Sequence, residues 1–177
     1  MRKILFATAA LLTCAITLEA AAQPISVNRK QVSAAAARKM VDACLAFAEK
    51  NNILVGVAVV DISGVLMDFH AMEGGGPTLS ETAILKAKTA AHWQRPTRLL
   101  EQDVTTLRNQ ASVWIHDFPK AGALPIVIDG RQFIGAIGVG GSAPKLPEWS
   151  DEICAWRALT KVMGPQPALL PDVARTQ

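Results

Sequence analysis

The segment 124–141 constrains the fold more than any other part of the chain, because it carries a strong β-hairpin signal. Two runs rich in apolar and β-branched residues, "LPIVID" and "QFIGAIGVGG", are joined at Asp129–Gly130. An Asp-Gly pair between such runs is typical of a tight turn, so the two strands must pair antiparallel. The second run contains several glycines, and the missing side chains either permit a bulge or leave room for something to lie against the backbone.

A second hairpin is predicted before it. Residues 53–61, "ILVGVAVVD", are apolar on both faces, which indicates a strand that is covered on both sides. After the turn "ISG", residues 65–72 run back, and alternation places Asp68, His70 and Met72 on one face.

Helical periodicity predicts helices around these hairpins. The expected ranges are 26–52, then 81–93 with Ser80 as its N-cap, then 98–111 capped by Thr97, and finally 151–163 capped by Ser150. Residues 111–123 are a loop or a short helix. Ala83, Ala87, Ala90 and Ala91 form a stripe of small residues, so the helix that carries them should lie close against the strands. We therefore expect an α/β (α+β) domain in which helices pack on an antiparallel sheet of four or five strands.

The N-terminus resembles a secretory signal peptide. Arg2 and Lys3 precede an apolar run of roughly 15 residues, shorter than the roughly 20 that span a bilayer, and small residues follow. Cleavage after Ala22 would leave a domain over 23–163 and a proline-containing tail over 164–177. The chain is expected to be periplasmic or secreted, with no membrane contact after cleavage.

The charge balance argues against nucleic acid as a partner. The net charge of +3 falls to +2 once Arg2, Lys3 and Glu19 are removed with the signal peptide. Because phosphate binding needs a concentrated positive face, and the remaining chain has no long basic cluster, a nucleic-acid-binding function is excluded.

Cys44 and Cys154 are the cysteines left after cleavage, and both lie on predicted helices. An oxidising compartment would allow a disulfide between them. Free cysteines are often simply buried small apolar groups, and the sequence favours that alternative without deciding between the two.

Common site motifs are missing or in the wrong context. "GVGGSA" has the spacing of a dinucleotide fingerprint but follows a hairpin strand and has no βαβ unit around it. No G-x-S-x-G elbow supports a serine hydrolase. His70, His92 and His116 have no metal-site spacing, so each is individually more typical of an ordinary surface or satisfied residue.

The stretch "FHAMEGGGPTLS" offers the best candidate for chemistry. His70 comes at the end of a strand, Glu73 follows it, and the glycines let the chain turn into a helix. An imidazole and a carboxylate at an open corner are candidates for a metal ligand and a general base.

Several stretches together resemble the GlcG/HbpS-like haem-binding family, which includes the C-terminal domain of PduO-type proteins. They are "VGVAVVDISGVLMDF", "MEGGGPTLSETAILKAKTAAHWQRPT", "LPIVIDGRQFIGAIGVGG" and "DEICAWRAL". The resemblance implies a profilin-like domain that assembles into homo-oligomers and, in some relatives, binds haem. Where the family usually has Arg, Asp and Ala, this chain has Ala71, Glu73 and Gly75.

The resemblance also implies a functional corner. Carried over residue by residue, it comprises Met72, Glu73, Gly74, Gly75, Ser80, Lys86, Thr89 and Thr97.

Three hypotheses follow. The first is an exported small-ligand-binding protein for haem or a related tetrapyrrole, with His70 or His92 on the iron and a pocket shared by the polar strand end and the glycine-rich strand. The second is a cofactor-free enzyme acting on a small organic acid, with Glu73 or His70 as general base and Lys86 on the substrate carboxylate. The third is an oligomeric interaction module whose glycine loop is only a tight corner.

Overall fold

The structure is a computed structural model in which residues 28–106, 108–141 and 148–169 are described. Its strands are β1 (Val55–Asp61), β2 (Leu66–Ala71), β3 (Ala123–Ile128) and β4 (Gln132–Gly141). Its helices are α1 (Ala34–Lys50), α2 (Pro77–Trp93), α3 (Thr97–Thr105), α4 (Ala111–Trp114) and α5 (Asp151–Met163).

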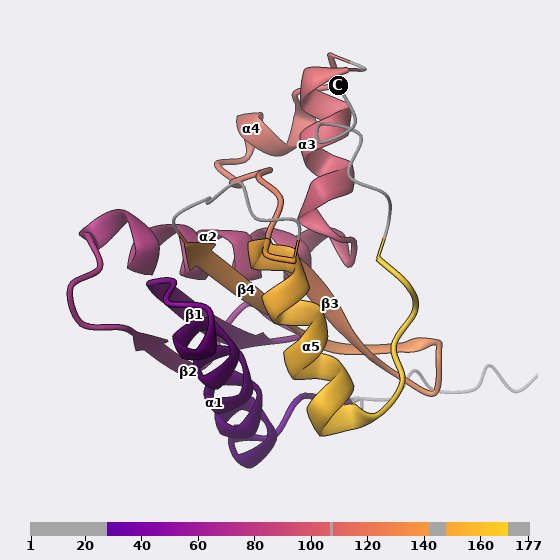
Figure 1. Cartoon of the computed structure of the whole chain (residues 1–177). Helices are drawn as coiled ribbons and strands as arrows, with labels where there is room; N and C mark the ends of the chain where they lie inside the picture. Colours follow the sequence, from indigo (N-terminus) through magenta and orange to yellow (C-terminus); the bar gives the residue numbers. More distant parts are fainter. Residues whose placement is uncertain (1–27, 107, 142–147, 170–177) are drawn as a thin grey trace, which may run out of the picture.

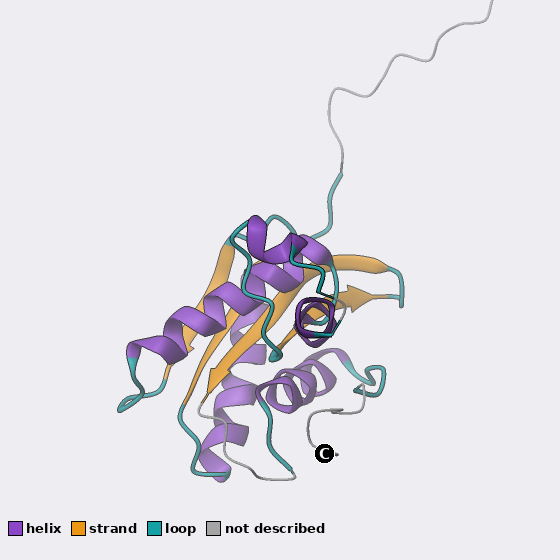
Figure 2. Cartoon of the chain, turned by 90° about the horizontal axis from the view of Figure 1, so that it is seen from above, coloured by secondary structure: helices purple, strands orange, loops and turns teal. Residues whose placement is uncertain are grey.

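The strands form one antiparallel sheet in the order β2-β1-β4-β3. Helices α1 and α5 lie side by side on one face, and α2 crosses the other face (Figure 1). Viewed from above, the strands lie between helices (Figure 2). Every residue of β1 is buried, as expected for a strand that is covered on both sides. The predicted α+β class and the antiparallel sheet of four or five strands are confirmed, and the sheet has four.

Both predicted hairpins form. At the β3–β4 turn, Asp129 and Gly130 take φ values of 53° and 64°, which is the left-handed conformation that favours an Asp-Gly pair. In β2, His70 pairs with Val57 and Asp68 with Val59, so the two polar residues share the face that α1 covers. The predicted alternation is therefore confirmed.

The glycines of β4 bring α2 against the sheet. A Cβ atom on Gly138 would lie 2.4 Å from the carbonyl oxygen of Ala83, and one on Gly140 would lie 2.3 Å from that of Leu79. Gly56 on β1 makes the same kind of approach, at 2.7 Å from Leu79 O. Ala83, Ala87 and Ala90 are fully buried on the helix side, so the predicted close packing of this helix is confirmed.

This packing corrects one expectation. The side-chain-free face of β4 was expected to line a pocket shared with the polar end of β2. Instead, the backbone of α2 occupies the space over Gly138 and Gly140. The glycines accommodate a helix rather than a ligand.

Two predicted helix caps are wrong. Helix α2 begins one turn earlier, with Gly76 as N-cap and Pro77 in its first turn, so Ser80 lies inside the helix. Proline suits the first helical position because its missing N–H would have no partner there. Thr97 is the first residue of α3 rather than its cap, which is Pro96. The predicted N-cap of α5, Ser150, is confirmed. Residues 111–114 form a short helix, which was one of the two alternatives for their segment.

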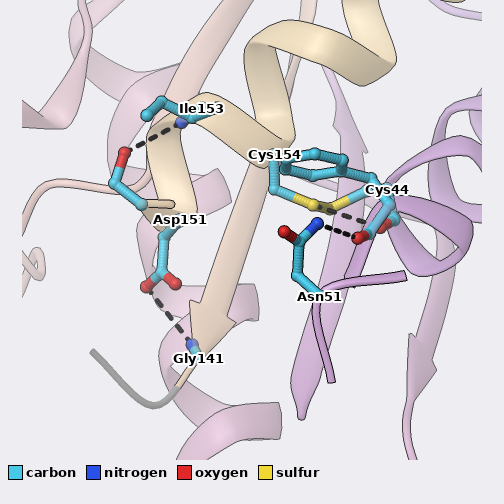
Figure 3. Close-up of a disulfide and its surroundings, with 8 residues drawn as sticks. Cys44, Asn51, Gly141, Asp151, Ile153 and Cys154 are labelled. Atoms are coloured by element: carbon cyan, nitrogen blue, oxygen red, sulfur yellow. Dashed lines mark hydrogen bonds between the residues drawn. A yellow bond between two sulfur atoms is a disulfide. The ribbon is translucent and has the colours of Figure 1, made fainter. Parts of the chain in front are cut away.

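A disulfide joins Cys44 of α1 to Cys154 of α5, with a Cα–Cα distance of 5.2 Å (Figure 3). The bridge is thus formed, whereas the sequence favoured buried free thiols. Both residues are fully buried and belong to the main core between the sheet and these two helices.

The predicted signal peptide, residues 1–22, lies outside the described residues. Among the residues that are described, no helix is long and apolar enough to cross a bilayer. Part of the predicted tail is described, and there the carbonyl of Pro167 accepts a hydrogen bond from the Trp156 indole at 2.7 Å.

Candidate functional site

The loop from β2 to α2 is built by glycines, as the sequence indicated. Gly74 has a φ of +81°, a conformation that other residues rarely adopt. The N–H of Gly75 donates to the carbonyl of Met72 at 3.3 Å, and α2 begins two residues later. The loop therefore reverses the chain within a few residues.

His70 and Glu73 at this corner are both exposed, and Met72 is half-buried against the main core. Asp68, which shares the face of His70, is paired with Arg38 Nε at 2.9 Å. Its carboxylate is thus engaged by α1. Within the described part of the chain, no hydrogen bond joins His70 to Glu73 or to Asp68.

Lys86 lies in the interior, away from this corner. It is nine residues along α2 from Pro77, or roughly 13 Å at the rise of an α-helix. Only 5% of the residue is exposed. Its ammonium group donates to Asp151 Oδ2 at 2.7 Å and to the carbonyl of Val139 at 2.9 Å.

Asp151 completes this connection, since it also accepts the N–H of Gly141 at 3.2 Å (Figure 3). One ion pair therefore ties α2, β4 and α5 together. The enzyme hypothesis needs Glu73 and Lys86 in one site, but Glu73 is exposed, whereas Lys86 is buried and already holds a carboxylate from the chain itself.

Thr89 and Thr97 are also buried and bound to backbone. The hydroxyl of Thr89 donates to Leu85 O at 2.8 Å and accepts from the N–H of Phe118 at 2.8 Å. The hydroxyl of Thr97 accepts from the N–H of Ala123 at 3.0 Å. These contacts hold the segment before β3 and β3 itself against α2 and α3, so both threonines have structural roles.

A second buried ion pair, which sequence reasoning missed, lies close to the first in sequence. Arg98 of α3 binds Glu152 of α5, and both residues are buried. No local pattern could have revealed it, because the partners are 54 residues apart.

His92, at the end of α2, has the most defined geometry of the predicted ligand residues. Its Nδ1 lies 2.8 Å from Asp117 Oδ1, and the indole N–H of Trp93 donates to the other oxygen of Asp117 at 2.7 Å. The Asp117 side chain is only 4% exposed, whereas that of His92 is 51% exposed. Since a carboxylate accepts hydrogen bonds, this contact selects the tautomer with its proton on Nδ1, and in that tautomer Nε2 carries the lone pair.

An exposed apolar surface lies just before Asp117 in the chain. Val113, Trp114 and Ile115 have exposed fractions of 45%, 79% and 57%, and we call them the α4 patch. The N–H of Asp117 donates to the carbonyl of Ser112 at 3.0 Å, so the turn that supplies the carboxylate also carries the patch. His116 is exposed in this turn.

A groove of about 410 Å³ lies between α1 and α5 on the opposite face of the sheet, and we call it the α1–α5 groove. Its lining combines small, aromatic and basic side chains: Ala43, Ala46, Phe47, Trp156, Arg157, Thr160 and Lys161. None of these is a histidine, cysteine or methionine. In residues 28–106, 108–141 and 148–169, no group of three or more potential ligands could hold a metal ion by itself.

Comparison with known proteins identifies the family. Residues 32–160 match the family model described as "Haem degrading protein HbpS-like". The chain belongs to this family. The resemblance inferred from the sequence is therefore confirmed.

Individual relatives agree. Protein GlcG of Escherichia coli (strain K12) is 36% identical over 92 residues, covering 52% of this chain and 68% of GlcG. A double mutant of HbpS from Streptomyces reticuli is 30% identical, with a TM-score of 0.67 over 82% of this chain and 99% of HbpS. PduOC, solved in complex with haem, has a TM-score of 0.64 at 22% identity, covering 75% of this chain and 96% of PduOC, which shows a shared fold.

Proposed function

We propose that the chain is an exported protein that binds haem or a related tetrapyrrole, with His92 as the ligand of the iron. Membership of a family described as haem-degrading supports the ligand class. The observation that carries the site is the geometry of His92, whose ring is oriented by the buried carboxylate of Asp117 and whose Nε2 makes no hydrogen bond within the described residues.

The carboxylate partner of His92 and the nearby sequence of Asp117 both support a tetrapyrrole as the ligand. A histidine whose second nitrogen is bonded to a carboxylate is a common arrangement in metal sites, because the carboxylate fixes the tautomer and makes the ligand more basic. The α4 patch offers apolar surface to a porphyrin in the segment that carries Asp117. When bound, haem would supply an iron centre for ligand binding and redox chemistry.

His70 was the first choice from sequence, but the structure favours His92. His70 is exposed on β2, and within the described residues no carboxylate is bonded to its ring, because Asp68 is paired with Arg38. Its neighbour Met72 packs into the core. The corner thus provides an imidazole without an orienting partner, and it remains the alternative site.

A haemin titration with matched histidine variants tests both the ligand and the site. We expect the purified protein to shift the Soret band of haemin, His92→Ala to weaken binding at least tenfold, and His70→Ala to leave it unchanged. Asp117→Asn should have an intermediate effect, because an uncharged amide oxygen accepts a weaker hydrogen bond from the ring than a carboxylate does. If the wild type gives no Soret shift, the function is wrong; if only His70→Ala weakens binding, the site is wrong.

Export is part of the proposal and has its own test. The sequence of residues 1–22 supports it through its basic start, apolar run and small residues at the end. N-terminal sequencing of the protein recovered after expression of the full chain in a Gram-negative host should begin at Gln23. Recovery of the intact N-terminus in the cytosol would contradict export.

We also propose that copies of the chain associate through the edge strand β2. Val65 and Leu66, at the start of this strand, are 58% and 42% exposed, and edge strands readily pair with a second chain. Replacing both residues by Lys should lower the mass measured by light scattering. An unchanged mass for the variant, or a wild type that is monomeric, would contradict this interface.

A further inference from the structure

We infer that the α1–α5 groove is a second ligand site, and that it takes a small aromatic carboxylate with no metal. This site is separate from the proposed haem site, because α1 and α5 cover one face of the sheet and α2, which carries His92, covers the other (Figure 1). It goes beyond the proposed function and does not depend on it.

The size and lining of the groove suit a ligand of a few fused or linked rings. Its volume of about 410 Å³ falls in the usual range of small-molecule sites, roughly 300 to 1,000 Å³. Ala43 and Ala46 on α1 leave the space open, and Trp156 on α5 forms an aromatic wall. The indole N–H of Trp156 donates to Pro167 O, so this ring is held in place.

The charge of the groove points to an anion. Arg157 and Lys161 are four residues apart on α5, one turn of helix, and both line the groove, whereas no acidic residue does. In the described part of the chain, neither cation is in an ion pair with a carboxylate. A carboxylate bound there would meet two positive charges without displacing an internal partner.

Arg157 is already positioned for such a contact. Its guanidinium lies over the ring of Phe47, 4.6 Å from the ring centroid. The Phe47 ring also stacks on Trp149, with centroids 5.2 Å apart and an interplanar angle of 16°. This contact holds the guanidinium beside the groove, and a guanidinium can form a bidentate bond to a carboxylate.

The groove is also pre-formed. The disulfide joins Cys44, next to Ala43, to Cys154, two residues before Trp156, and thereby fixes the separation of the two helices. A site whose walls are held before binding loses less conformational entropy when the ligand enters. The absence of histidine, cysteine and methionine from the lining makes an organic anion, rather than a ligated iron, the matching ligand.

Titration with 2-naphthoate, and with the neutral 2-naphthamide as its matched control, tests this inference on the intact protein. We expect calorimetry to detect 2-naphthoate binding and the indole N–H signal of Trp156 to shift, with at least tenfold weaker binding of the amide. Arg157→Gln/Lys161→Gln should weaken 2-naphthoate binding at least tenfold. Lys88→Gln removes an exposed lysine from α2, on the opposite face of the sheet, and should leave binding unchanged.

A blocking variant keeps the test valid if loss of the Arg157–Phe47 contact destabilises the fold. Ala46 is exposed, so Ala46→Trp should fill the groove without disturbing the core and abolish binding. The inference is wrong if the wild type does not bind 2-naphthoate, if the amide binds equally well, or if Ala46→Trp binds like the wild type. His92→Ala should leave 2-naphthoate binding unchanged, which separates this result from the fate of the haem proposal.

Discussion

Replacing Gly138 by Ala should destabilise the protein severely, because the added methyl group would collide with the backbone of α2. The new Cβ would lie 2.4 Å from Ala83 O and 2.5 Å from Ala87 N. Ordinary van der Waals contact begins at 3.4 Å, so the helix and the strand would have to separate by about 1 Å. Neither backbone atom can rotate away, unlike the end of a side chain.

The cost follows from this displacement. Overpacking a core typically costs about 1–3 kcal/mol, and a collision with two backbone segments belongs at the upper end or above. We therefore expect a loss of about 3 kcal/mol or more from a total stability of roughly 5–15 kcal/mol. For a domain of this size, that corresponds to a fall in melting temperature of roughly 6–12 °C.

Thermal and urea unfolding followed by circular dichroism would measure the effect. Gly75→Ala is the matched control, since the nearest atom to its Cβ, at 2.7 Å, is the flexible end of Leu79. We expect the control to cost less than about 1 kcal/mol. Equal melting temperatures for Gly138→Ala and the wild type would refute the conclusion that α2 fills the space over β4.

Other predictions concern the internal contacts. Lys86→Met should lower the free energy of unfolding in urea by about 3 kcal/mol, the lower end for a broken buried ion pair, because Asp151 keeps its backbone hydrogen bond. The double variant with Asp151→Asn should cost less than the sum of the two single variants, and strict additivity would contradict coupling between the two residues. Cys44→Ala with Cys154→Ala should cost about 2–5 kcal/mol, because the closed loop spans 110 residues, and an unchanged denaturation midpoint would show that the bridge adds nothing. Thr97→Val leaves a buried backbone N–H unpaired and should cost about 1–3 kcal/mol by thermal unfolding, whereas a change below about 0.5 kcal/mol would argue against that hydrogen bond.

The hairpins and the close approach of α2 could be predicted because their signals are local. The Asp129–Gly130 pair specifies its turn through two adjacent residues, and the alanine stripe of α2 and the glycines of β4 each show that a close neighbour is tolerated. The sequence of β4 alone could not show whether a helix or a ligand lies over its glycines, since either one needs a strand face without side chains.

The start of α2 was misplaced because two capping signals compete. Ser80 is a good N-cap residue, but the Gly76–Pro77 pair lies one turn earlier and also starts a helix well. The additional turn packs against the sheet through its backbone, since Leu79 O lies over Gly56 and Gly140, and this contact depends on the tertiary structure.

The site was harder to predict because its partners are distant in sequence. Lys86 was expected to hold the carboxylate of a ligand, and it does hold a carboxylate, but that of Asp151, which lies 65 residues away. His92 was recognised as a possible ligand, whereas its partner Asp117 gave no signal at a separation of 25 residues. The disulfide was left open for the same reason, since it requires a Cα–Cα distance that only the fold provides.

The bond between Cys44 and Cys154 makes the chain from residue 44 to residue 154 a covalent ring. A protease that cuts once within the ring, for example at the β3–β4 turn, would open it without releasing a fragment. Mass spectrometry before and after reduction would therefore show one species and then two. While the bond is intact, a single cut can release a segment only where it falls outside the ring, towards either end of the chain.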